Sequence, residues 1–383
     1  MVQKITIRCY GGVNVDLPDC TEIHTSLFAV LHHFQNLSSI EACSVNFTTE
    51  IITQIFALAN LRKLHLEWCR TDSSILALRV DPRSRVVELS YTEVELEGNQ
   101  QVGPTGDPWW LRLLSRDKTK EIRISQPHNV DGLLRFITEG PAMTGLVTLT
   151  ISSGGRPLFV AAMTKCPAID TFILLRPRWG KEEIVHVGKQ LQERGALSGV
   201  TRIAGPVELV LALLQTSLLK SIKITTQMTE EDSLQLVREI RDHRPEIVRL
   251  KLDIDRVRSR FIPEVLALPS LEWLEVVTQS LDQPIVWCEY DSLNDEWDPL
   301  VSLRFPKNLE YLSISTWGAR VEHHNLSPDR SLEGVDTHYP WLFQQLMSEC
   351  PKLWKFEIVT SLGEVAWQKD DITASQGPDF ASE

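Results

Sequence analysis

Residues 61–69, LRKLHLEWC, constrain the fold of this chain more than any other stretch. The apolar side chains of Leu64 and Leu66 alternate with polar neighbours. Because successive side chains of a strand point to opposite faces, both leucines must enter the same face of a short strand. One such strand cannot cover its own apolar face, so the pattern requires that it be stacked against others of the same kind.

The spacing of these residues recurs along the whole chain. It predicts strands centred near Ile40, Leu64, Leu89, Ile122, Leu149, Phe172, Ile222, Leu250, Leu274, Leu312 and Phe356, with a degraded copy at Val200 and Ile203. The more regular intervals are about 22 to 28 residues, and L-x-x-L-x-L-x-x-N/C is the spacing of a leucine-rich repeat. We therefore expect an α/β solenoid, a horseshoe with a concave parallel sheet and about 11 to 13 irregular repeats.

Helical periodicity is visible in several segments between the strands. Apolar residues share one helix face in residues 27–34, 182–194 and 232–243, and residues 48–58 predict another helix with Thr49 as its cap. In residues 27–34 the predicted buried face consists of Leu27, Val30, Leu31 and Phe34. Helices between the strands favour the ribonuclease-inhibitor-like class of horseshoe.

The repeats predict a single domain over residues 1–367. Three segments break the period, near residues 93–110, 280–305 and 318–339. Insertions of this kind leave a solenoid on one face, which is often the binding face. The polar residues 368–383 predict a disordered tail.

The charge and the cysteines limit the classes of partner. The chain has 39 Lys and Arg against 51 Asp and Glu, a formal net charge of -12. Such a surface repels phosphate, so we expect no nucleic-acid partner, and a basic protein partner would be complementary to it. The seven cysteines form no C-x-x-C motif, which favours reduced, buried thiols.

The sequence predicts neither a targeting segment nor catalytic chemistry. Residues 1–12 begin with strand-like alternation rather than an apolar signal core, and no apolar run is long enough to cross a membrane. We expect a cytoplasmic or nuclear monomer. The His32–His33 and His323–His324 pairs have no metal-ligand spacing, and no nucleophile or phosphate-loop motif is present. We therefore expect a non-enzymatic protein without metal or cofactor.

Two strands follow a C-P-x-[LI] motif, at residues 166–169 and 350–353. This motif resembles the leucine-rich halves of F-box proteins, and the irregular repeats with insertions resemble the fungal members. The resemblance implies that the repeats hold a substrate for a ubiquitin ligase. We expect the F-box itself to be absent from this sequence, either lost or located upstream of residue 1. Residues 48–58 are similar to it, but they lack its leading Leu-Pro and are followed closely by a repeat strand. We interpret them as a repeat helix.

Outward positions on three consecutive C-terminal strands carry the residue types that anchor protein interfaces. We expect a protein-binding surface that consists of Arg249, Lys251, Trp273, Glu275 and Tyr311, roofed by Trp287, Tyr290 and Trp297 from the insertion. In contrast, Glu88, Ser90, Thr148, Thr150 and Ser152 on earlier strands would offer a partner little apolar area.

Three alternatives remain open at this point. The insertion at residues 280–305 could cover the patch and bury it. It could instead close a pocket over a small ligand or glycan. The protein could also be a purely structural scaffold.

Overall fold

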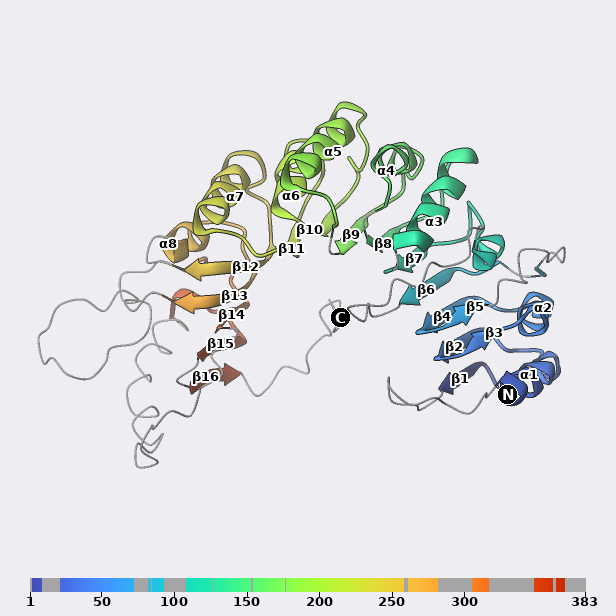
Figure 1. Cartoon of the computed structure of the whole chain (residues 1–383). Coiled ribbons are helices and arrows are strands. Elements are labelled where there is room, and N and C mark those ends of the chain that lie inside the picture. Colours follow the sequence, from blue (N-terminus) through green and yellow to red (C-terminus); the bar gives the residue numbers. More distant parts are fainter. Residues whose placement is uncertain are drawn as a thin grey trace, which may run out of the picture. The chain divides into compact units, whose positions relative to one another are not determined.

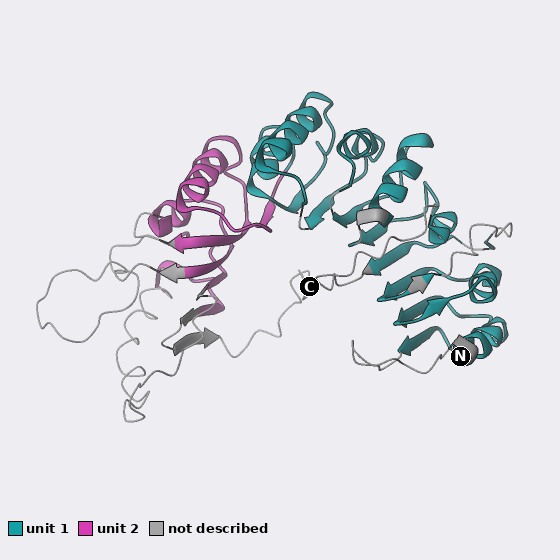
Figure 2. Cartoon of the chain, in the orientation of Figure 1, with its two compact units in different colours: residues 1–218 teal, residues 219–383 magenta. Residues whose placement is uncertain are grey.

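The computed structural model describes residues 2–8, 21–71, 82–83, 85–92, 108–125, 127–152, 154–175, 177–257, 261–281, 305–316, 348–360 and 363–368. The chain divides into two compact units, Met1–Leu218 and Leu219–Glu383 (Figure 2). Each unit is an α/β structure in which helices lie on one side of a mainly parallel sheet (Figure 1). No helix in these described ranges is both long and apolar enough to cross a membrane.

The first unit contains eight parallel sheet strands in chain order. They are β1 (Lys4–Arg8), β2 (Ser39–Cys43), β4 (Lys63–Glu67), β6 (Glu88–Thr92), β7 (Glu121–Ile124), β8 (Thr148–Ser152), β9 (Thr171–Leu175) and β10 (Arg202–Gly205). A second, two-stranded sheet pairs β3 (Asn46–Phe47) with β5 (Arg70–Thr71). The helices are α1 (Thr21–Ala29), η1 (Leu31–His33), α2 (Thr49–Ala57), η3 (Trp109–Leu113), α3 (Pro127–Glu139), α4 (Arg156–Met163), α5 (Lys181–Glu193) and α6 (Val207–Leu214).

The second unit repeats the same alternation at its start. Its elements are β11 (Ser221–Ile224), α7 (Glu230–His243), β12 (Arg249–Val257), α8 (Phe261–Leu266), β13 (Trp273–Leu281), β14 (Tyr311–Thr316), β15 (Lys355–Thr360) and β16 (Gly363–Gln368). Strands β11 to β15 are parallel, and β16 pairs with β15 in the antiparallel sense. The repeat spacing does not predict β16, because this strand returns along its neighbour instead of following a new repeat.

Register places the predicted strand centres side by side. In the first unit the aligned residues are Ile40, Leu64, Leu89, Ile122, Leu149, Phe172 and Ile203, all buried. In the second they are Ile222, Leu250, Leu274, Leu312 and Phe356, also buried. The predicted strand positions are therefore confirmed, and the copy interpreted as degraded supplies a full strand, β10.

Strands β2, β4, β6 to β10 and β12 to β15 each begin with the same pair of hydrogen bonds to the strand before them. Two successive backbone N–H groups donate to one carbonyl oxygen, as Arg62 and Lys63 do to Ser38. The other shared acceptors are Gln3, Arg62, Val87, Lys120, Val147 and Asp170 in the first unit and Lys220, Val248, Glu272 and Glu310 in the second. One local geometry thus sets the register of successive strands throughout both units.

The helices differ from the sequence prediction mainly at the N-terminal end. Residues 27–34 are divided between α1 and η1, and Leu27 and Val30 are exposed while Phe28 and Leu31 are buried. The prediction was right for Leu31 and wrong for Leu27 and Val30, because a short segment fits two neighbouring helical registers almost equally well. In α2 the cap is Thr48 rather than Thr49: its hydroxyl accepts from the N–H of Ile51 at 3.4 Å.

The later helices follow the prediction more closely. Helix α5 buries Ile184, Val187 and Leu191 as expected. Helix α7 buries Val237 and Ile240, and its capping hydroxyl comes from Thr229. These two helices have acidic first turns, which favour the positive end of the helix dipole.

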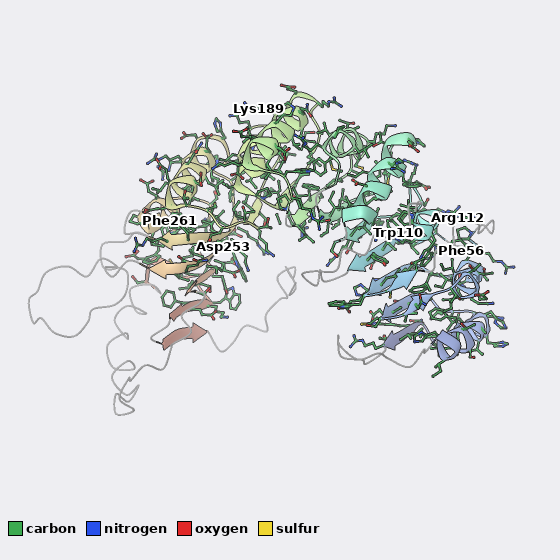
Figure 3. The ribbon with its side chains drawn as sticks, viewed as in Figure 1. Phe56, Trp110, Arg112, Lys189, Asp253 and Phe261 are labelled. Atoms are coloured by element: carbon green, nitrogen blue, oxygen red, sulfur yellow. The ribbon has the colours of Figure 1, made fainter. Side chains whose placement is uncertain are left out.

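The end of the first predicted insertion belongs to the core. Trp109 and Trp110 lie in η3 and are buried, and the Trp109 ring is 5.5 Å from Phe47 and 6.1 Å from Phe56 between centroids. The Arg112 guanidinium lies 5.3 Å from the centroid of the Phe56 ring (Figure 3). The preceding insertion residues, up to residue 107, lie outside the described residues.

The sulfur atoms of two buried cysteines lie within hydrogen-bond distance of backbone carbonyl oxygens. Cys69 Sγ lies 3.3 Å from the carbonyl oxygens of Ala42 and Glu67, and Cys350 Sγ lies 3.4 Å from that of Pro306. Burial raises the pKa of the Cys69, Cys166 and Cys350 thiols to about 12, so these thiols stay protonated at neutral pH. These three cysteines and Cys43 are free within the described part of the chain.

Candidate functional site

The parallel strands β12 to β15 bring four outward side chains into one line. Arg249 pairs in register with Trp273, Trp273 with Tyr311, and Tyr311 with Lys355. Each residue immediately precedes a buried core residue on its strand, so its side chain leaves from the opposite face. We call these four residues the aromatic row.

The centre of the aromatic row is a stacked pair of rings. The Trp273 and Tyr311 centroids are 3.7 Å apart and the two ring planes differ by 13°. Trp354, just before β15, tilts against both rings at centroid distances of 6.1 Å and 5.8 Å. Aromatic pairs contribute roughly 0.5–1.5 kcal/mol beyond the area they bury, so the stack favours this arrangement of the rings.

A cation stands at each end of the stacked pair. The Arg249 guanidinium lies 5.6 Å from the Trp273 ring centroid, and the Lys355 ammonium lies 5.6 Å from the Tyr311 centroid. Because β12 and β14 flank β13 on opposite sides, Arg249 and Tyr311 approach the Trp273 ring from two different neighbouring strands.

Two lysines in and beside the aromatic row form ion pairs with carboxylates. Lys251 Nζ lies 2.6 Å from the Glu275 carboxylate, and Lys355 Nζ lies 2.8 Å from the Glu357 carboxylate. All four side chains are partly exposed, so each ion pair contributes modestly to stability. The pairs do, however, fix the orientation of the long side chains beside the aromatic row.

Exposure differs along the aromatic row. Tyr311 is 9% exposed, and its burial raises the pKa of the phenol, which is therefore uncharged at neutral pH. Arg249, Trp273, Trp354 and Lys355 are all partly exposed. The row thus combines one buried ring, that of Tyr311, with partly accessible neighbours, which is an arrangement suited to an interface anchor.

The structure brings together five of the predicted site residues and adds others. Arg249, Lys251, Trp273, Glu275 and Tyr311 lie on adjacent strands, as expected. Trp287, Tyr290 and Trp297 lie outside the described residues, so the predicted roof is untested.

The sequence reasoning missed two members of the cluster, Trp354 and Lys355. The signal was present, because the sequence LWKFEI had already predicted β15. Extending the outward positions to that strand would have included Lys355 beside Tyr311.

On the earlier strands, the outward hydroxyl side chains differ in their exposure. Thr150 and Ser152 on β8 are buried, and their hydroxyl groups have no hydrogen-bond partner, whereas Thr148 is partly exposed. Thr150 lies in register between Arg123 and Ile173 of the neighbouring strands, which carry longer side chains. The buried Thr150 and Ser152 therefore offer a partner little apolar area.

Compared with models of known protein families, the chain matches none, and no curated protein matches it. Within the ranges that the structure describes, no three His, Cys, Asp or Glu side chains gather as a metal site would require. The inference of function therefore depends on the geometry of the aromatic row.

Proposed function

We propose that this chain is a leucine-rich-repeat solenoid that binds a protein partner through the aromatic row. The repeat assignment is supported by the recurring sequence spacing and by the paired N–H donors that begin most of the parallel strands in the described ranges. Repeats of this class form extended surfaces on which outward residues of neighbouring strands act together.

The observation that carries the proposal is the Trp273–Tyr311 stack between two cations. Tryptophan, tyrosine and arginine are the residue types most enriched among the anchors of protein interfaces. Here they are adjacent, and the stack holds them in place before binding. A preformed anchor loses little conformational entropy when the partner docks, which increases affinity.

The geometry favours a protein partner over a glycan. Sugar rings bind proteins by lying flat on an exposed aromatic face, but Tyr311 stacks on the Trp273 ring and the Arg249 guanidinium lies 5.6 Å from the centroid of that ring. The edges and the flanking charges of the row remain accessible. Such a mixed surface is typical of a protein interface, with an apolar centre and a polar rim.

A narrower form of the proposal follows from the resemblance to F-box proteins. In that form the chain is the substrate-recognition part of a ubiquitin-ligase adaptor, acting in the cytoplasm or nucleus. Co-precipitation of ligase scaffold subunits with the full-length native protein would support this narrower form, and their absence would leave only the general binding function.

The test is a quantitative pull-down from native lysate with the wild type, Trp273→Ala and Trp273→Phe. Removing the indole should cost about 2 kcal/mol or more of binding free energy, because an anchor is lost from the centre of the surface. Trp273→Phe keeps a ring for Tyr311 to stack on and should retain more of the bound proteins than Trp273→Ala.

Thr148→Ala is the control, since Thr148 occupies an outward position on a strand without anchor residues. It should retain every partner. Thermal unfolding of each variant must match the wild type before its binding is interpreted. If Trp273→Ala folds normally and keeps all partners, the aromatic row is not the binding surface.

A further inference from the structure

Among the described cations in and beside the aromatic row, some form ion pairs with a carboxylate and one does not. Lys251 and Lys355 each have a carboxylate within ion-pair distance. Arg249 has none among the described residues, and its contact is with the Trp273 ring. Within the described ranges, the row therefore contains one guanidinium that has no carboxylate partner.

The position of Arg249 increases its preference for an anion. The side chain is partly buried, and the Trp273 ring holds the planar guanidinium along one face. A guanidinium in this state has lost part of its hydration but keeps its fork of N–H donors. A carboxylate matches that fork with two parallel, charge-assisted hydrogen bonds.

We propose that the aromatic row binds an acidic peptide segment of the partner, with a carboxylate on Arg249 and an apolar neighbour against the edges of Trp273 and Trp354. This inference rests on the proposed protein-binding function and specifies the chemistry of the partner. It differs from what the net charge of -12 suggests, because one uncompensated cation at the contact decides local complementarity.

The neighbouring charges exclude a longer polyanion. Glu275 and Glu357 lie in the register row next to the aromatic row, and their ion pairs with Lys251 and Lys355 leave these lysines less available to phosphates. Nucleic acids require several cations that each neutralise a phosphate. One guanidinium without a carboxylate among the described residues, flanked by ion pairs, is instead suited to one or two carboxylates.

The experiment uses the full-length protein and three pools of immobilised twelve-residue peptides. Each pool is degenerate except for a central pair, which is Asp or Glu in the first, Asn or Gln in the second, and Lys or Arg in the third. Wild-type protein should be retained on the acidic pool about tenfold more strongly than on the neutral one, the effect expected of one charge-assisted bidentate contact.

Three variants locate the effect. Arg249→Gln should abolish the preference for the acidic pool, and Arg249→Lys, which keeps the charge but not the fork, should retain part of it. Lys220→Gln is the matched control. Lys220 is an exposed cation, and its backbone carbonyl, which the substitution keeps, accepts the N–H groups of Val248 and Arg249. This variant should behave as the wild type.

Several outcomes overturn the inference. These are retention on no pool, equal retention on all pools, preference for the basic pool, or an Arg249→Gln variant that behaves like Lys220→Gln. The two proposals remain separable. If Trp273→Ala loses cellular partners while Arg249→Gln shows no effect on peptides, the protein-binding function stands and the acidic-peptide inference fails.

Discussion

At the scale of single residues, the partial burial of Asp253 on the outward face of β12 lowers the stability of the folded protein. Asp253 alternates with Leu252 and Ile254, which are fully buried, so its side chain leaves from the opposite face (Figure 3). Partial burial raises the pKa of this carboxyl above its ordinary value, although Lys251 acts in the opposite direction. The folded protein therefore holds the charged form less favourably than the unfolded chain does.

Asp253→Asn should consequently stabilise the protein at neutral pH. A carboxyl whose pKa is higher in the folded state costs no stability when both states are protonated. The cost develops as the pH rises from the unfolded value, about 4, through the folded one. The melting temperature of the variant should exceed that of the wild type at about pH 7 and equal it near pH 3.

The matched control for this measurement is Asp255→Asn. Asp255 is exposed on the same strand, and its Oδ1 accepts from the N–H of Arg256 at 2.6 Å, a role that an asparagine oxygen can keep. This variant should leave the melting temperature nearly unchanged. If Asp253→Asn destabilises the protein at neutral pH, the carboxylate makes a favourable contact that outweighs its desolvation.

At the scale of elements, the strands could be predicted and the helix boundaries only in part. Strand positions follow from strict alternation, because a slip of one residue would expose every core side chain. Helix α1 carries no such constraint, since Phe28 and Leu27 are adjacent and either could define the buried face. Strand β16 was missed because it has no repeat of its own.

The candidate site was predictable to the same extent as the strands. Once Leu250, Leu274 and Leu312 are aligned, the residues before them, Arg249, Trp273 and Tyr311, must be neighbours. The ring stacking, the ion pairs and the burial of Thr150 depend on rotamers and on neighbouring side-chain length. Those quantities are set by tertiary packing, which spacing along one chain does not encode.

The turns after β2 and β4 share a strained backbone conformation. Ser44 and Trp68 have φ angles of 59° and 57°, in the left-handed region that favours glycine. The Ser44 N–H donates to the Glu67 carbonyl oxygen at 2.8 Å, which holds the first turn against the next strand. The geometry is thus retained in two successive turns even though neither contains glycine.

Ser44→Gly should stabilise the fold by about 0.5–1 kcal/mol. Glycine removes the steric cost of the left-handed conformation, which for other residues is about 1–2 kcal/mol, but loses some of this through its greater freedom when unfolded. Ser39→Gly within β2 is the control and should destabilise by roughly 0.5–1 kcal/mol. Urea denaturation of both variants measures the difference. A loss of stability in Ser44→Gly would show that its side chain matters more than its backbone angle.

At the scale of the whole molecule, sheet pairing in each unit follows chain order. In the described part of the chain each strand pairs only with the sheet strands immediately before and after it. If the protein is a solenoid, as we propose, its stability is close to a sum of repeat terms and nearest-neighbour terms. A local defect should then weaken adjacent repeats much more than distant ones.

Leu64→Asp tests this directly. Leu64 is 1% exposed between Ile40 and Leu89 of the neighbouring strands, so the variant places an unpaired carboxylate in the core at a cost of about 3 kcal/mol or more. Amide hydrogen exchange should accelerate strongly in β2, β4 and β6 and remain at wild-type rates in β12 to β14. His65→Asn, an outward-facing change on the same strand, should leave both regions protected as in the wild type. Equal acceleration across all strands would mean that the chain unfolds as one cooperative core, and the proposed solenoid with nearest-neighbour stability would be wrong.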